Sequence, residues 1–386
     1  MNRRQALCRI GIASLSFPFL NFARFQPFAG TPEKYSARCV DLVQRSLVID
    51  MLSQFKLGAF PDLVPDPNPP TARWWSHPET FTSSDLARYR ESGINVFQIG
   101  WGTGKRDPRD GAIRVLSGWK RFVDHFDHDF ARVLSVANID ALKPSKKIGI
   151  LLGFQGSDHF QKFDDIDYFY GLGQRLSQLT YNDHNAIGSG YEVSDSGLTA
   201  YGREVVGRMN QAGMAIDLSH CGPRTTLQSC ELSQRPVLFT HANCQALNPH
   251  SRNKSDLLIK KMAATGGVMG ISSVRQLVSR REPVTVDNVV DHFDHVAHLV
   301  GVEHVGIGSD IDLDGYDKLP PALRAKMLTG YRHHAAVRGD IEGLNHPKRV
   351  FDLTEALIRR GYSDANIELI LGGNFRRALA AIWESH

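Results

Sequence analysis

Two histidines stand at equivalent places in the sequence, each directly after a short apolar run. His220 follows residues 214–219, and His241 follows residues 237–240. Neighbouring strands of a sheet lie about 4.8 Å apart, so two imidazoles at the ends of such strands are close enough to bind one metal ion. The pattern therefore favours a functional site over two unrelated polar side chains.

Two further polar residues follow apolar runs. Arg252 lies after the run 237–240, and its guanidinium can bind a carboxylate through two parallel hydrogen bonds. Asp310 ends the stretch 304–310 and can act as a base or as a metal ligand. The alternatives are a surface ion pair for Arg252 and a helix cap for Asp310.

The elements that must position these residues are short strands alternating with helices. Apolar spacing near 3.6 residues predicts helices between the strands, for example at 201–211 and 286–300. Eight runs read as buried parallel strands: 47–50, 94–99, 147–153, 176–181, 214–219, 237–240, 267–271 and 304–308. Eight such units predict a (β/α)8 TIM barrel with its active site at the carboxyl ends of the strands.

Two other features bear on this fold. A doubly wound open sheet is the alternative, but no glycine-rich nucleotide-binding motif follows any strand. The proline-rich stretch 61–78 is interpreted as a long loop over the active-site face. The repeated Asp-His-Phe-Asp-His at 124–128 and 291–295 falls on helical stretches, which lie outside a barrel, so we expect no metal site there.

Composition narrows the function. The chain has 386 residues with 45 Lys and Arg against 41 Asp and Glu, a net charge of +4, and no basic run interleaved with aromatic residues. This argues against a nucleic-acid partner. Five scattered cysteines do not form a disulfide scaffold or a C-x-x-C pair.

The first thirty residues differ from the rest. They carry four arginines, among them the pair Arg3 and Arg4, and no acidic residue. The apolar stretch 10–20 is too short to span a bilayer, so we expect no transmembrane span in the mature protein. Residues 1–30 resemble a bacterial twin-arginine signal, which predicts export to the periplasm; a disordered basic arm is the alternative. Residues 36–386 are expected to form the single barrel domain.

Several segments together resemble the renal (membrane) dipeptidase family, peptidase family M19. They are residues 197–206 (GLTAYGREVV), 213–220 (GMAIDLSH), His241, 251–253 (SRN) and 304–310 (HVGIGSD), within a match over residues 36–382. The resemblance implies a barrel of the metallo-dependent-hydrolase type with a binuclear zinc site that hydrolyses dipeptides. It also suggests a homodimer.

Carried over by position, the resemblance assigns a role to four matching residues. His220 and His241 become ligands of one zinc, and Arg252 binds the substrate carboxylate. Asp310 contacts the substrate amine and transfers protons.

The other half of the family's site is altered. The family's Asp-x-His-x-Asp after the first strand is here Asp50-Met-Leu52-Ser-Gln54, so both zinc ligands are replaced. Gln155 stands where the family has the glutamate that bridges the metals. Tyr181 stands in place of a histidine that contacts substrate, and we expect it to bind substrate or act as an acid.

These substitutions predict at most one zinc ion. Two neighbouring divalent cations repel strongly, and the carboxylates that would offset that repulsion are missing. A single zinc could use His220 and His241 with Gln155 or Asp310 and water, or the site could hold no metal. Four polar residues past the third and fourth predicted strands are candidate replacement ligands: Asp158, His159, Asp183 and His184. Asp50 points into the barrel more deeply and is interpreted as structural.

Three functions remain open from the sequence. The first is a hydrolase of small peptide or amide substrates with at most one zinc. The second is a non-hydrolytic enzyme, such as an isomerase or tautomerase acting on a secreted metabolite, with His220, His241, Tyr181 and Asp310 as acids and bases. The third is a binding protein without catalysis.

Overall fold

The computed structural model describes residues 34–56, 74, 77–102, 107–317 and 339–383. The chain divides into two units, Met1–Lys34 and Tyr35–His386, and the elements described below belong to the second. Most of the proline-rich stretch 61–78 lies outside the described residues. Trp74, within that stretch, is buried with its ring perpendicular to that of Phe81, at a centroid distance of 4.8 Å.

Among the described residues, nine strands form one sheet in which neighbouring strands run parallel. The strands are β1 (Ile49–Ser53), β2 (Val96–Trp101), β3 (Phe130–Arg132), β4 (Ile148–Phe154), β5 (Leu176–Gln178), β6 (Ala215–Asp217), β7 (Val237–Ala242), β8 (Val268–Ile271) and β9 (Val305–Ile307).

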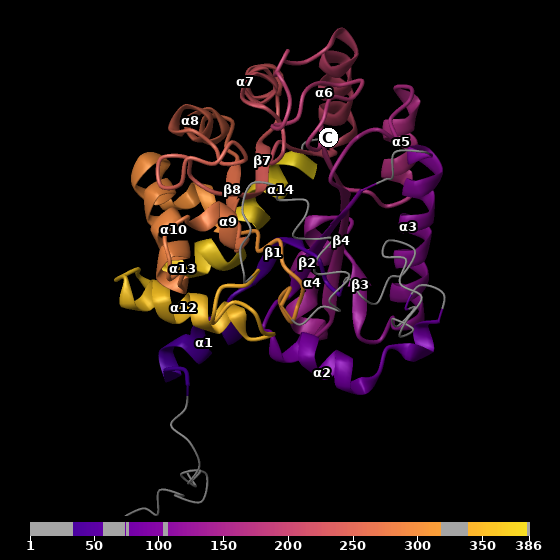
Figure 1. The fold of residues 1–386 in the computed structure, drawn as a ribbon. Coiled ribbons are helices and arrows are strands. Elements are labelled where there is room, and N and C mark those ends of the chain that lie inside the picture. The colour runs from indigo at the N-terminus through magenta and orange to yellow at the C-terminus, as the bar shows by residue number, and fades with distance from the viewer. Residues whose placement is uncertain (1–33, 57–73, 75–76, 103–106, 318–338, 384–386) are drawn as a thin grey trace, which may run out of the picture. The chain divides into compact units, whose positions relative to one another are not determined.

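The sheet closes on itself. Its order is β2-β1-β9-β8-β7-β6-β5-β4-β3, and β2 also pairs with β4 from Val96↔Gly149 to Trp101↔Phe154. This pairing closes a ring of eight strands, all of which correspond to the predicted runs, and the predicted (β/α)8 TIM barrel is confirmed (Figure 1). The additional strand, β3, pairs with the first half of β4 and was not predicted, because it is three residues long and only Phe130 is buried.

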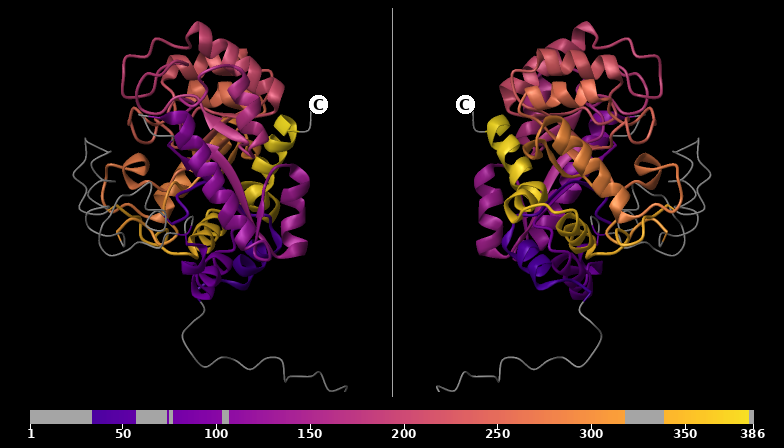
Figure 2. Two further views of the ribbon diagram at one scale, coloured as in Figure 1. Left: turned by 90° about the vertical axis from the view of Figure 1, so that its right-hand side faces the viewer. Right: turned by 90° about the vertical axis from the view of Figure 1, so that its left-hand side faces the viewer.

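Helices surround the ring of strands (Figure 2). They are α1 (Ala37–Arg45), α2 (Ser83–Glu91), α3 (Pro108–His125), α4 (Val136–Ser145), α5 (Asp164–Gly171), α6 (Ala200–Ala212), α7 (Pro223–Leu232), α8 (Asp256–Ala264), α9 (Arg275–Val278), α10 (Val286–Val300), α12 (Arg349–Arg359), α13 (Asp364–Glu368) and α14 (Asn374–Trp383), with short helical turns η3 (Pro78–Thr80), η4 (Val302–His304) and η5 (Leu369–Gly373).

The helices predicted at 201–211 and 286–300 correspond to α6 and α10. Local chemistry fixes the ends of α6. The Thr199 side chain accepts a hydrogen bond from the Gly202 amide at the start, and Gly213 ends the helix at a φ of 70°, which favours glycine. The second copy of the repeated motif lies on α10, where His295 contacts Asp256 of α8 at 2.7 Å, so this histidine joins two outer helices.

The amino-terminal ends of the strands are packed against α14. Asn374 at its start donates hydrogen bonds to the carbonyl of Val302 and to that of Val305, the first residue of β9. Phe375 and Leu379 share an apolar cluster with Val268 of β8. This packing leaves the opposite, carboxyl ends of the strands for polar residues.

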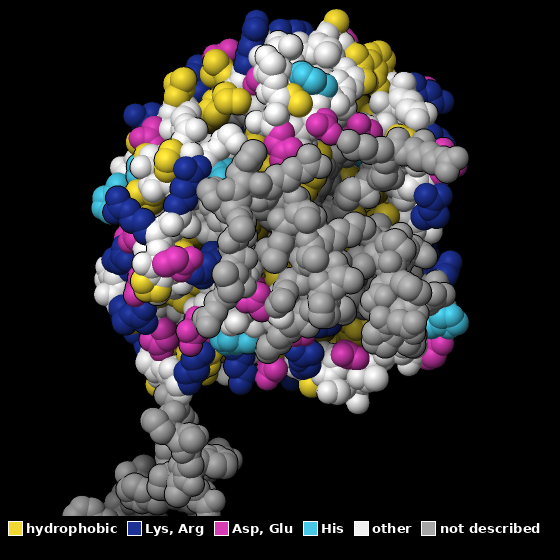
Figure 3. Space-filling view, viewed as in Figure 1, with side chains coloured by type: hydrophobic (Ala, Val, Ile, Leu, Met, Phe, Trp, Pro, Cys, Tyr) yellow, Lys and Arg dark blue, Asp and Glu magenta, His cyan; other side chains and the backbone are white. Residues whose placement is uncertain are grey.

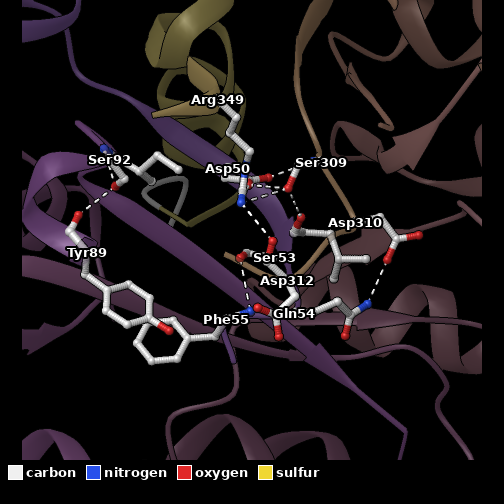
Figure 4. Close-up of polar contacts among 12 residues, drawn as sticks. Asp50, Ser53, Gln54, Phe55, Tyr89, Ser92, Ser309, Asp310, Asp312 and Arg349 are labelled. Atoms are coloured by element: carbon white, nitrogen blue, oxygen red, sulfur yellow. Dashed lines mark hydrogen bonds and ion pairs between the residues drawn. The ribbon is translucent and has the colours of Figure 1, made fainter. Parts of the chain in front are cut away.

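Asp50 links β1 to the loop after β9 and to α12. Its carboxylate accepts hydrogen bonds from the Ser309 amide at 2.8 Å and from Arg349 at 3.0 Å, and all three residues are buried (Figure 4). This agrees with the interpretation of Asp50 as structural.

The described part of the chain contains no helix long and apolar enough to cross a membrane. Its four cysteines, Cys39, Cys221, Cys230 and Cys244, are buried and free.

Candidate active site

The two predicted histidines meet at the carboxyl ends of the strands. His220 follows β6 and His241 lies in β7, and their Nε2 atoms are 3.0 Å apart. Both side chains are buried. Burial, followed by the nearby Arg252 guanidinium, holds the pKa of both imidazoles well below the usual range. The pair is therefore neutral at pH 7, as metal ligands must be.

Each ring is held through its other nitrogen. His220 Nδ1 lies 2.8 Å from Asn182 Oδ1, and His241 Nδ1 lies 2.7 Å from Thr240 Oγ1. The Asp217 carboxylate accepts hydrogen bonds from the Thr240 hydroxyl at 2.7 Å and from the Ser219 hydroxyl at 2.6 Å. Asp217 thus ties the end of β6 to β7 and sets the orientation of the His241 ring.

The two histidines provide part of the ligand set that one metal ion needs. Two neutral imidazoles that converge through Nε2 are suitable for two positions of a zinc ion. Within the described ranges, no group of three or more His, Cys, Asp or Glu side chains could hold a metal. Any further ligands there would have to be water, substrate or an amide oxygen.

The residues that replace the family's other metal ligands have different partners. Gln54 Nε2 donates to Asp310 Oδ1 at 2.7 Å (Figure 4), and Gln155 Nε2 donates to the Gly100 carbonyl at 2.9 Å. Leu52 is buried against Gly100, where an added Cβ would lie 2.5 Å from Leu52 Cδ1. An apolar side chain and two amides therefore occupy the positions where the resemblance places an imidazole and two carboxylates.

Asp310 lies just past β9 with its carboxyl group buried. Burial raises the pKa of Asp310 to about 7, although the Gln54 hydrogen bond acts in the opposite direction. Its backbone has a φ of 56°, and the Tyr316 hydroxyl donates to its carbonyl oxygen. A carboxyl group with this pKa can both take up and release a proton near neutral pH.

Arg252 is buried and joins the ends of two strands. Its terminal nitrogens donate to the carbonyls of Ser219 and of His241, the latter at 2.7 Å. These bonds use two of the five N–H donors of a guanidinium and join the ends of β6 and β7, so three donors remain for other partners.

Sequence reasoning missed Lys254. Its Nζ is buried and donates to the carbonyls of Leu218 and Cys221 at 2.8 and 2.9 Å, and burial lowers the pKa of Lys254 to about 7. From the sequence, a lysine outside the predicted strands and helices is expected to be solvated. Only the fold shows that Lys254 contacts the backbone on either side of His220.

A cleft of about 670 Å³ opens beside the histidines. Tyr181 lines it with its ring stacked on His220, at a centroid distance of 4.2 Å, and with 47% of its surface exposed. The lining residues are Gly102, Pro108, Gln155, Gly156, Asp158, Tyr181, Asn182, Asp183, His184 and Asn185. The structure thus brings Tyr181 and Gln155 to one cleft.

The candidate replacement ligands fall into two groups. Asp158, Asp183 and His184 line the cleft. His159 does not, and its prediction as a ligand is wrong: its ring is buried between Phe154 and Phe160 and contacts Gln174 at 3.0 Å. Burial lowers the pKa of His159 to about 3. Its apolar neighbours make it a core residue.

Comparison with known protein families decides the lineage. The model of the membrane dipeptidase family, peptidase family M19, matches residues 41–328. The chain belongs to this family. The resemblance inferred from residues 197–310 is confirmed.

Individual relatives agree with membership of the M19 family. The dipeptidase verJ of Clonostachys rogersoniana is 31% identical over 244 residues, which cover 62% of this chain and 57% of that protein. An amidohydrolase from Pseudomonas aeruginosa superposes with a TM-score of 0.74 at 24% identity, covering 90% of this chain and 99% of that one. A Rhodobacter sphaeroides metallopeptidase, bound to a phosphinate mimic of L-Ala-D-Ala, has a TM-score of 0.70 at 18% identity, with 88% and 100% covered. The two structures share the fold of this M19 protein.

Proposed function

We propose that this protein hydrolyses small peptide or amide substrates with at most one zinc ion, bound by His220 and His241. The observation that carries the proposal is the pair of buried, neutral imidazoles whose Nε2 atoms lie 3.0 Å apart in a member of the dipeptidase family. Leu52, Gln54 and Gln155 provide no anionic ligand for a second ion.

Each residue of the candidate site has a role in this proposal. Arg252 uses its remaining N–H donors to bind a substrate carboxylate. Asp310 accepts a hydrogen bond from the substrate amine and transfers protons. Tyr181 covers His220 and shields it from bulk water on the cleft side. When bound, zinc supplies Lewis-acid polarisation of the scissile carbonyl.

Hydrolysis of a dipeptide panel tests the proposal. We expect the wild-type protein, supplied with zinc, to release amino acids, and His220→Ala and His241→Ala to lose at least a hundredfold in kcat/KM. His298→Ala is the matched control, because His298 is exposed on the outer helix α10, where its ring contacts the Asp294 carbonyl of the same helix. Equal activity in all four proteins would refute the assignment of the two histidines.

A second candidate function is acid–base catalysis without hydrolysis. It is favoured by the buried Asp310 carboxyl group with a pKa of about 7, which interacts electrostatically with Tyr181 and Arg252. This function predicts that proton exchange into a bound substrate survives a strong zinc chelator and is lost in Asp310→Asn.

A further inference from the structure

A series of hydrogen bonds runs from His220 to the loop between β5 and α6. Asn182 Oδ1 contacts His220 Nδ1 at 2.8 Å, and Asn182 Nδ2 donates to Glu192 Oε1 at 2.9 Å. The Tyr191 hydroxyl donates to the same oxygen at 2.8 Å. Glu192 is therefore two hydrogen bonds away from the ring, although His220 itself follows β6.

The chemistry of these groups fixes the direction of each bond. A carboxylate only accepts, so Asn182 turns its NH2 group toward Glu192 and its carbonyl oxygen toward His220. An amide oxygen also only accepts, so the hydrogen of the neutral His220 ring lies on Nδ1. His220 Nε2 then presents a lone pair to His241.

The same argument applies to His241. The Thr240 hydroxyl has one hydrogen, which it donates to Asp217 Oδ2 at 2.7 Å, so Thr240 Oγ1 accepts from His241 Nδ1. Both Nε2 lone pairs therefore face each other at 3.0 Å. Two lone pairs at this distance repel, whereas a cation held by both rings is attracted to each of them.

The loop is built to bring Glu192 to this position. Its backbone pairs with the segment after β5 through Gly190 N to Asp183 O at 3.0 Å and Glu192 N to Asn182 O at 3.1 Å. A Cβ on Gly190 would lie 2.1 Å from the Tyr181 carbonyl oxygen, so only glycine permits this approach. The Glu192 side chain is exposed and fills no part of the core.

We propose that Glu192 is a positioning residue that, through Asn182, holds His220 with its hydrogen on Nδ1 and so prepares the His220–His241 pair for a divalent cation. This role rests on the proposed function. It makes the loop between β5 and α6 part of the metal site, although the loop supplies no ligand.

Replacement of Glu192 tests this role by two measurements. Zinc affinity is measured by competition with a chelator, and the 15N shifts of the His220 ring are measured in zinc-free, histidine-labelled protein. We expect Glu192→Ala to weaken zinc binding about tenfold or more and to move the ring signals toward a mixture of tautomers. Glu192→Gln should fall between Glu192→Ala and wild type, because its amide oxygen can still accept from Asn182.

Glu204→Ala is the matched control, since Glu204 is exposed on the neighbouring helix α6 and should change neither measurement. Unchanged thermal unfolding of Glu192→Ala would exclude a general loss of structure. The proposal is overturned when Glu192→Ala binds zinc within twofold of wild type and keeps the hydrogen on Nδ1. Wild-type protein without zinc affinity would refute the proposed function and the cation-binding part of this role, whereas the ring shifts would still test separately whether Glu192 holds the hydrogen on Nδ1.

Discussion

At the scale of single residues, Asp310 connects the altered half of the site to the retained half. Gln54 occupies a family metal-ligand position and donates to Asp310 instead. The same carboxyl group is a candidate for proton transfer. Its burial therefore has consequences for both stability and catalysis.

We expect Asp310→Asn to stabilise the protein increasingly as pH rises. Folding raises the pKa of this carboxyl group from 3.8 to about 7, so its contribution to stability is present below pH 3.8 and is lost as pH rises through 7. The asparagine keeps an oxygen for Gln54 and cannot ionise. In urea unfolding of zinc-free protein, the difference from wild type should grow between pH 5 and 7 by about 2 kcal/mol and then level off. A difference that is constant with pH would contradict the raised pKa.

Restoring the family's ligands should restore the second ion. The triple variant Leu52→His, Gln54→Asp and Gln155→Glu replaces an apolar side chain and two amides with an imidazole and two carboxylates. We expect elemental analysis to rise by one zinc per chain relative to wild type. A folded triple variant with an unchanged zinc content would contradict the explanation that these three substitutions alone exclude the second ion.

At the scale of elements, α12 is held to the barrel by a buried ion pair. Arg349 of α12 contacts Asp50 of β1 at 3.0 Å, and both side chains are almost inaccessible to water. Removing one partner leaves the other charge buried and unpaired.

Arg349→Met is expected to lower the free energy of unfolding by about 3 to 5 kcal/mol. Arg359→Met on the same helix is the control, because Arg359 pairs with Asp287 in an exposed position and should contribute less than about 1 kcal/mol. Denaturant unfolding of both variants measures the difference. Similar losses in the two would contradict the structural role of Asp50.

The sequence pattern predicted the strands and helices better than it predicted the contacts of side chains in the loops. The eight barrel strands follow from short continuous apolar runs, because strands of a parallel barrel are buried on both faces. The helices α6 and α10 follow from apolar spacing near 3.6 residues, because only one face of each packs on the barrel. His220 and His241 could be predicted as a pair because strand ends converge in a parallel barrel. The positions of Lys254 and Glu192 relative to His220 could not be predicted, since each lies in a different loop from His220 and only the fold brings them together. His159 was misjudged because the sequence does not show that its ring turns into the aromatic core.

At the scale of the whole molecule, the first thirty residues differ from the rest of the chain in net charge. Without their four arginines, 41 basic residues balance 41 acidic ones. Side chains of both signs are interspersed on the described surface in Figure 3. Positive charge is therefore a property of the amino-terminal segment and carries no information about the substrate.

We propose that residues 1–30 direct export by the twin-arginine route. In a bacterial host, Arg3→Lys combined with Arg4→Lys should leave the protein in the cytoplasm, because that route reads the arginine pair. Cell fractionation measures the outcome, and Arg9→Lys with Arg24→Lys is the control that also conserves charge. Equal export of both variants would contradict the signal.

Zinc content per chain tests the central claim most directly. The account predicts one zinc in wild-type protein purified from the compartment where it folds, and none in His241→Ala, while His298→Ala keeps one. No zinc or two zinc ions in the wild type, or a zinc retained after loss of His241, would contradict a single ion held by His220 and His241.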